Sequence, residues 1–145
     1  IALRAGENGM WWLLTLFCIS AGTDTFAYFG GRLWGKRKLA PTVSPSKTVE
    51  GAVIGAAGGF ALALLALWAG GNWSMAAVVM LAFGPTVAIL GDLFESALKR
   101  HYHVKDSHLA HLNLLPGHGG VLDRIDSALF IAVYGYVWLI VGGLM

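Results

Sequence analysis

Four long apolar stretches alternate with polar segments along the chain. A transmembrane helix needs about 20 mostly apolar residues, and each stretch is close to that length. The pattern predicts an all-α polytopic membrane protein with about four transmembrane helices and two polar loops. The predicted spans are residues 10–29, 51–70, 74–98 and 127–145. Pro85, which follows Gly84, predicts a kink in the third span.

Composition and charge agree with this pattern and fix an orientation. The chain is 57% hydrophobic and 12% charged, whereas a soluble domain carries about 25% charged residues. A net charge of +2 is too small to indicate a nucleic-acid partner. Nine of the ten Lys and Arg residues lie in segments 31–50 and 99–126, and the positive-inside rule makes that side cytoplasmic. We therefore expect the chemistry at the cytoplasmic face of a membrane, typically a bacterial inner membrane.

The start of the chain indicates a longer architecture. The sequence opens with Ile1, and residues 1–9 lack the basic region and the small-residue cleavage site of a signal peptide. We expect residues 1–145 to form a single membrane-embedded catalytic domain, the C-terminal part of a larger protein.

The cytoplasmic end of the third span carries a graded polar stripe. Asp92, Glu95, Ser96 and Lys99 follow at i, i+3, i+4 and i+7, which places them on one helix face. Glu95 is equally well explained by a helix-end ion pair with Lys99 and by a role in a site. Asp92 lies deeper and has no basic residue within one turn, so a metal-ligand role is favoured.

A second acidic pair, spaced at i and i+3, lies at the start of the fourth helix. Asp123 and Asp126 follow the turn PGHGG. The positive N-terminal end of a helix accounts for Asp126. Asp123 lies nearer to the glycines, where an anion can approach exposed backbone N–H groups. Carboxylates from two helices, with cations between them, form a plausible cage for Mg²⁺ bridging phosphate oxygens.

The first polar loop contains SPSKTVEG, in which three hydroxyl side chains flank Lys47. Thr48 also fits the N-cap of the next helix, but a cap gives no reason for the lysine. Upstream, Asp24 and Tyr28 share one face of the first span at i, i+4. Five histidines lie between residues 101 and 118 without acid or thiol partners at zinc-site spacing. Only His118 is expected at the reaction centre.

Read together, these strings resemble the phosphatidate cytidylyltransferase family, also called CDP-diacylglycerol synthases. The resemblance covers residues 20–130. It rests on D-x-x-A-Y-x-x-G from Asp24, S-P-x-K-T-x-E-G from Ser44, S-x-x-K-R from Ser96, K-D at residues 105–106, and P-x-H-G-G-x-x-D-R-x-D from Pro116. The nine residues between Asp106 and Pro116 form a longer spacer than the family pattern has.

The resemblance implies a nucleotidyltransferase of phospholipid biosynthesis. It would transfer the cytidylyl group of CTP to phosphatidic acid, giving CDP-diacylglycerol and pyrophosphate. The cofactor would be Mg²⁺ or Mn²⁺, with K⁺ as a further ion. Asp92 and Asp123 would hold the metal, and Asp24 and Asp126 would complete its shell. The expected catalytic residues are Lys47, Lys99, Arg100, His118 and Arg124. The expected substrate-binding residues are Ser44, Ser46, Thr48, Ser96, Gly117, Gly119 and Gly120.

Other functions stay open at this point. Another CTP-using membrane lipid enzyme, of the polyprenol kinase or CDP-archaeol synthase type, has the same requirements. An ion-coupled transporter would spread acids through the membrane thickness, and a structural subunit would not need carboxylates among its cations. The predicted partners are CTP, phosphatidic acid and the lipid bilayer, with a homodimer left open and no nucleic acid.

Overall fold

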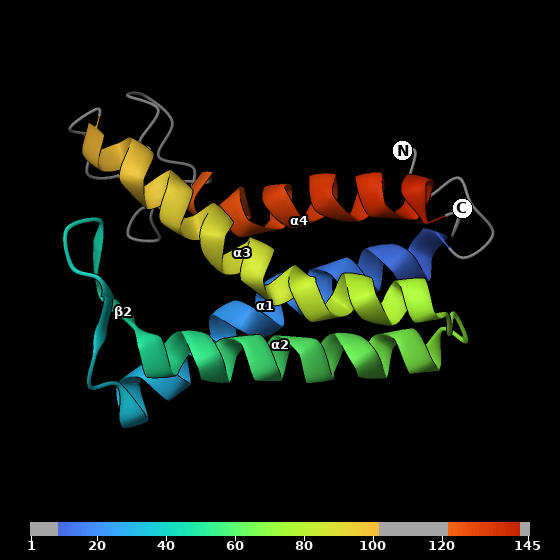
Figure 1. Cartoon of the computed structure of the whole chain (residues 1–145), viewed down its shortest axis with the longest axis horizontal. Helices are drawn as coiled ribbons and strands as arrows, with labels where there is room; N and C mark the ends of the chain where they lie inside the picture. The colour runs from blue at the N-terminus through green and yellow to red at the C-terminus, as the bar shows by residue number, and fades with distance from the viewer. Residues whose placement is uncertain (1–8, 102–121, 143–145) are drawn as a thin grey trace.

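The computed structural model describes residues 9–101 and 122–142, without the side chains of residues 122–127. Within these residues four helices run alternately up and down, with a two-stranded antiparallel hairpin between the first two (Figure 1). The elements are α1 Gly9–Trp34, β1 Lys38–Ala40, β2 Ser44–Thr48, α2 Val49–Ala69, α3 Met75–His101 and α4 Leu122–Val141.

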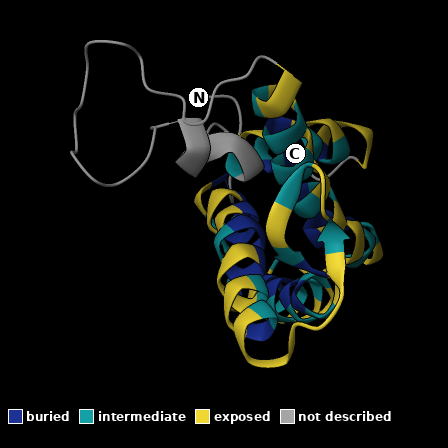
Figure 2. Ribbon diagram, turned by 90° about the vertical axis from the view of Figure 1, so that its left-hand side faces the viewer, coloured by how far each residue is buried: buried dark blue, intermediate teal, exposed yellow. Residues whose placement is uncertain are grey.

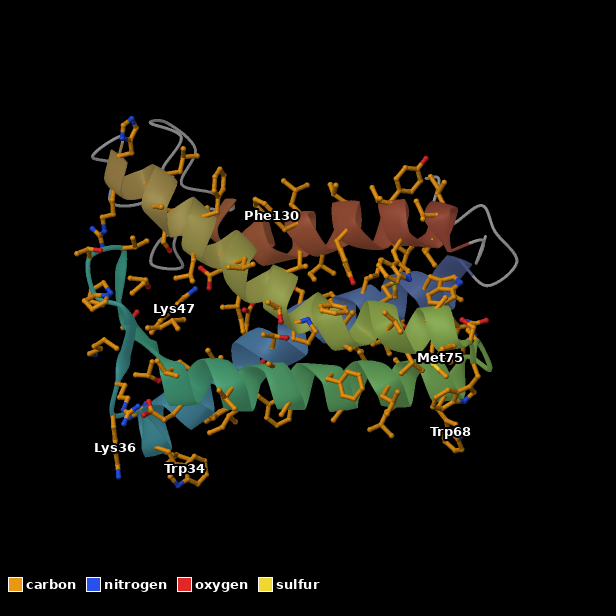
Figure 3. All side chains as sticks on the ribbon, viewed as in Figure 1. Trp34, Lys36, Lys47, Trp68, Met75 and Phe130 are labelled. Carbon is orange, nitrogen blue, oxygen red and sulfur yellow. The ribbon has the colours of Figure 1, made fainter. Side chains whose placement is uncertain are left out.

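The predicted all-α polytopic membrane fold is confirmed. Among the described residues, α1, α2 and α3 are long and apolar enough to cross a membrane, and α4 contributes the shorter apolar stretch Ala128–Val141. The outward surface is largely exposed apolar side chains, whereas buried residues face the neighbouring helices (Figure 2). Trp34 lies at the hairpin end and Trp68 at the opposite end (Figure 3). Both indoles are exposed, as expected where a helix meets lipid headgroups.

The helices extend further into the polar segments than the apolar pattern predicts. α1 continues to Trp34 instead of residue 29, α3 continues to His101, and α4 begins at Leu122 instead of residue 127. Helical backbone satisfies its own hydrogen bonds, and long basic side chains at a helix end can reach water. The polar stripe of α3 is therefore entirely helical.

Close packing of α1 and α2 depends on glycines spaced four residues apart on α2. Gly51, Gly55 and Gly59 are all buried. A Cβ at Gly55 would lie 2.6 Å from the Ala27 Cβ, and one at Gly59 would lie 2.2 Å from the Thr23 Oγ1. Small residues let two membrane helices approach this closely. The contact fixes the C-terminal half of α1 against the beginning of α2.

α3 packs on α4 and carries Pro85 within its length. The helix bends along its course (Figure 1), as a proline that lacks an N–H group favours. On α4, the Tyr134 hydroxyl donates to the Met80 carbonyl at 2.9 Å, and the Trp138 indole donates to the Ala76 carbonyl at 3.0 Å. These contacts satisfy the polar tips of two aromatic side chains inside an apolar bundle.

Within the described residues, the hairpin of β1 and β2 is the part of the fold that the sequence pattern did not predict. Glu50 holds the connection between α1 and β1. Its carboxylate accepts hydrogen bonds from the backbone N–H groups of Lys36, at 3.0 Å, and Arg37, at 3.1 Å. At the hairpin turn, Arg100 Nε of α3 donates to the Val43 carbonyl at 3.3 Å. The hairpin thus bridges the adjoining ends of α1 and α2 to the end of α3.

Candidate functional site

A cavity of about 460 Å³, with a mostly apolar lining that includes several charged side chains, lies at the hairpin end of the helices. Ala52 of α2 and Ile89 of α3 supply part of its apolar wall. Its polar lining comes from Thr23, Asp24, Tyr28 and Arg32 of α1, from Ser46, Lys47 and Thr48 of β2, and from Asp92 of α3. Segments that are distant in the sequence therefore direct charged groups into one cavity.

Lys47 and Asp92 form an ion pair across this cavity. The Lys47 ammonium donates to Asp92 Oδ2, and about a quarter of each side chain is exposed (25% and 28%). Figure 3 shows Lys47 reaching from the hairpin toward α3. The sequence places no basic residue within one helix turn of Asp92. Its partner Lys47 instead lies 45 residues earlier in the chain. Partial burial strengthens the attraction between the two charges relative to water.

Thr48 forms the corner where the hairpin passes into α2. Its hydroxyl accepts a hydrogen bond from the Gly51 N–H at 3.1 Å and caps the helix. A Cβ at Gly31 would lie 2.9 Å from this hydroxyl, and one at Gly51 would lie 2.8 Å from the Ala27 carbonyl oxygen. Glycine at both positions lets α1 approach the cap. The predicted N-cap role is confirmed, and it orients the preceding Lys47.

Asp24 and Asp92 bring carboxylates from two helices to the same cavity. Oxygen ligands suit a divalent ion such as Mg²⁺, which commonly binds one or two carboxylates together with substrate phosphates. The described part of the chain contains no group of three or more His, Cys, Asp and Glu residues that could hold a metal. Two carboxylates that line one cavity suit an ion that is shared with phosphate oxygens.

The polar stripe of α3 divides between the cavity and the helix end. Glu95 is buried, with 8% of its surface exposed, and its carboxylate pairs with the Lys99 ammonium at 2.7 Å. The helix-end ion pair expected as one of two explanations for Glu95 is therefore present. Only Asp92 of this stripe lines the cavity.

Comparison with known proteins assigns the chain to a family. The sequence profile described as the cytidylyltransferase family matches residues 2–141. The chain belongs to the cytidylyltransferase family. Within this family, it is 42% identical to the phosphatidate cytidylyltransferase of Bacillus subtilis over 142 residues, which are 92% of this chain and 49% of that protein.

Further relatives of the same name show similar agreement. The phosphatidate cytidylyltransferase of Thermotoga maritima is 44% identical over 121 residues, which cover 79% of this chain and 43% of that protein. The phosphatidate cytidylyltransferase of Haemophilus influenzae is 42% identical over 126 residues, which cover 83% of this chain and 42% of that protein. The chain therefore spans about half the length of the curated relatives that it matches.

Two of the cytidylyltransferase strings in this sequence meet at the cavity. D-x-x-A-Y-x-x-G on α1 and S-P-x-K-T-x-E-G on β2 and α2 contribute most of its lining. Nine of the predicted site residues have described side chains. Five of them line the cavity: Asp24, Ser46, Lys47, Thr48 and Asp92. The other four do not: Ser44, Ser96, Lys99 and Arg100.

The remaining predicted residues lie in the other part of the signature. Gly117, His118, Gly119 and Gly120 fall outside the described residues. Asp123, Arg124 and Asp126 belong to the first two turns of α4, where the side chains are not described. Their roles in the site stay predictions.

Sequence reasoning did not select Tyr28, Arg32 or Thr23 as site residues, although all three line the cavity. The spacing held a usable signal, because Asp24, Tyr28 and Arg32 follow at i, i+4 and i+8 on one helix face. That signal was obscured by ending the first helix at residue 29, which left Arg32 in a loop.

Proposed function

We propose that this chain forms the membrane-embedded catalytic domain of a phosphatidate cytidylyltransferase. The reaction transfers the cytidylyl group of CTP to phosphatidic acid and yields CDP-diacylglycerol and pyrophosphate. The observation that carries the proposal is the convergence of Lys47 and Asp92 in one cavity at the end of helices that are long and apolar enough to cross a membrane. Family membership and the names of the relatives support the same chemistry.

The cavity suits two substrates of unlike solubility. It lies at the hairpin end, and that end holds the basic residues of the 31–50 segment. CTP would arrive from the cytoplasm, whereas the acyl chains of phosphatidic acid would stay in the bilayer. A location in a bacterial inner membrane and a homodimeric assembly stay predictions of the sequence.

In the proposed reaction, an oxygen of the phosphatidic acid phosphate attacks the α-phosphorus of CTP. A new P–O bond forms at the α-phosphorus. The bond from the α-phosphorus to the oxygen that bridges it to the β-phosphorus breaks, and pyrophosphate leaves with that electron pair. The attacking phosphate monoester is already anionic, so no strong general base is required. Positioning and charge neutralisation then account for most of the rate.

Lys47 is the cation best placed for this neutralisation among the described residues. Its ammonium already lies in the cavity beside Asp92, and an ammonium on a flexible stem can move to a phosphate oxygen. Thr48 keeps the end of β2 fixed through its cap, and Ser46 offers a hydroxyl donor in the cavity lining. The proposal also assigns phosphate contacts to Lys99, Arg100, His118 and Arg124, and a pyrophosphate cradle to the PGHGG backbone.

Asp24 and Asp92 would hold a divalent cation, Mg²⁺ or Mn²⁺, with Asp123 and Asp126 as further predicted ligands and K⁺ as a second ion. Such a cation neutralises phosphate charge and orients phosphoryl oxygens when bound. The two described carboxylates line the same cavity as Lys47, which is the arrangement that this role requires.

The position of a label in CTP tests the proposal. The chain, reconstituted with phosphatidic acid, receives CTP labelled either in the cytosine ring or in the γ-phosphate. Cytidylyl transfer predicts ring label in the lipid fraction, stoichiometric pyrophosphate release and loss of both with EDTA. Label from the γ-phosphate in the lipid would instead identify a lipid kinase. Absence of both labels from the lipid would reject transfer chemistry and favour transport. Replacing phosphatidic acid with an ether-linked lipid phosphate tests the archaeol-type alternative.

A further inference from the structure

The rim of the cavity carries a hydrogen-bonded arginine and tyrosine that the proposed chemistry does not yet use. Tyr28 and Arg32 lie one turn apart near the end of α1, and both are exposed while lining the cavity. Arg32 Nη1 donates a hydrogen bond to the Tyr28 hydroxyl at 3.1 Å. The Tyr28 ring in turn packs edge-on against Phe29, with 5.5 Å between the ring centroids. The guanidinium is thus held at the cavity mouth by an oriented phenol.

The positive charge of Arg32 is available for an anion. The ion pairs among the described side chains join Lys47 to Asp92 and Lys99 to Glu95, and neither uses Arg32. The Tyr28 hydroxyl is a neutral acceptor, and its own proton can still be donated. A guanidinium that offers several N–H donors beside a phenol O–H matches the oxygens of a phosphate group.

The surroundings of this pair indicate a lipid phosphate. Phe29, Leu33 and Trp34 expose 55%, 65% and 61% of their surfaces beside it on the same helix end. An exposed apolar and aromatic surface at a helix end is typical of the headgroup level of a bilayer. The cavity mouth at Arg32 therefore adjoins a surface for acyl chains, whereas Lys47 and Asp92 lie on the side formed by the hairpin and α3.

We propose that Arg32 and Tyr28 form the subsite for the phosphate headgroup of a membrane-embedded lipid phosphomonoester, which reaches the cavity along α1. This inference rests on the proposed function and specifies which side of the cavity receives the lipid. Arg32 binds the phosphate through paired N–H donors, and Tyr28 orients the guanidinium and adds an O–H donor. The triphosphate of CTP, a second source of phosphate oxygens, occupies the side nearer to Lys47.

Kinetics with both substrates varied separately test this assignment. Arg32→Ala in nanodiscs should raise KM for phosphatidic acid by about tenfold, the effect of losing a charge-assisted hydrogen bond, with KM for CTP unchanged. Arg32→Lys should recover part of the loss because it keeps the charge without the planar fork. Tyr28→Phe should raise the lipid KM by a smaller factor. Lys38→Ala is the matched control, since Lys38 is an exposed cation at the same end that does not line the cavity.

The possible results separate cleanly. If Lys38→Ala had an equal effect, Arg32 would act only through the general positive charge of the surface. If KM rose for CTP alone, Arg32 would bind the nucleotide. Either result overturns the inference. Unchanged kinetics in both Arg32→Lys and Tyr28→Phe would overturn it even if Arg32→Ala failed to fold.

A binding measurement distinguishes this inference from the proposed function. Native mass spectrometry of the chain with phosphatidic acid or phosphatidylcholine, without CTP, should show phosphatidic acid retention that Arg32→Lys and Tyr28→Phe weaken. Arg32-dependent retention without cytidylyl transfer would reject the proposed function and leave the subsite in place. Transfer with Arg32-independent retention would reject the subsite alone.

Discussion

The Lys47 ammonium contacts the Asp92 carboxylate across 45 residues of sequence, joining the hairpin to the polar stripe of α3. In this arrangement the two opposite charges neutralise each other. If the proposed roles hold, a phosphate group on Lys47 and a cation on Asp92 would replace this one contact with two new ones. The pair lies partly exposed in the cavity, so both groups can be reached without unfolding the hairpin.

Removing the lysine should make Asp92 a better cation ligand. In Lys47→Met, Asp92 loses its ammonium partner, and we expect Mn²⁺ affinity without CTP to rise by about fivefold, since a nearby positive charge opposes a cation. Electron paramagnetic resonance of free Mn²⁺ measures this directly. Lys38→Met provides the control for a general loss of positive charge. Weaker Mn²⁺ binding in Lys47→Met would contradict the idea that the lysine and the metal share Asp92.

Glu50 is expected to act through the backbone of the α1–β1 connection. Its carboxylate accepts the N–H groups of Lys36 and Arg37, so Glu50→Ala should free both amides. Hydrogen exchange at these two positions should accelerate by about tenfold, while amides inside α2 keep their protection. Glu50→Gln, which retains one acceptor oxygen, should give an intermediate rate. Unchanged exchange at both amides in Glu50→Ala would show that other contacts hold the connection.

The glycines of α2 should tolerate no added methyl group where they face α1. Gly55→Ala places a Cβ 2.6 Å from both the Ala27 Cβ and the Thr23 carbonyl oxygen, and this overpacking should cost about 1–3 kcal/mol. The midpoint of thermal unfolding in detergent should fall accordingly. Ala57→Val enlarges an exposed position on the same helix and should have little effect. Equal midpoints for Gly55→Ala and the unaltered chain would mean that α1 and α2 pack less closely.

The helices could be predicted from the sequence because each contains a long apolar run with few charges. Their polar ends could be predicted only in part: Asp123 was placed at the start of the fourth helix, whereas Arg32 lies beyond the predicted end of the first. The hairpin was missed for a different reason. Its strand β2 reads SPSKT, with a proline and no apolar alternation, and it is held by Glu50 and Arg100 from outside the hairpin.

The candidate site was predictable where its residues share a helix face or a motif. Asp92 and Lys47 were selected for separate reasons, yet no spacing rule reveals that they touch, because the contact depends on where the hairpin crosses α3. Arg32 needed only a longer α1 to appear on the face that Asp24 and Tyr28 already shared. The ion pair of Glu95 with Lys99 differs in this respect, because an i, i+4 spacing on one helix already suggests it from the sequence.

Incorporation of ring-labelled cytidine into lipid by Asp92→Asn, beside Glu95→Gln, tests the central claim that the Lys47–Asp92 cavity is the reaction site. Both substitutions remove one carboxylate charge from α3, but only Asp92 lines the cavity. Asp92→Asn should lower metal-dependent incorporation at least about 100-fold while the protein remains folded in detergent, and Glu95→Gln should keep most of the activity. Near-normal incorporation by a folded Asp92→Asn variant would contradict the account.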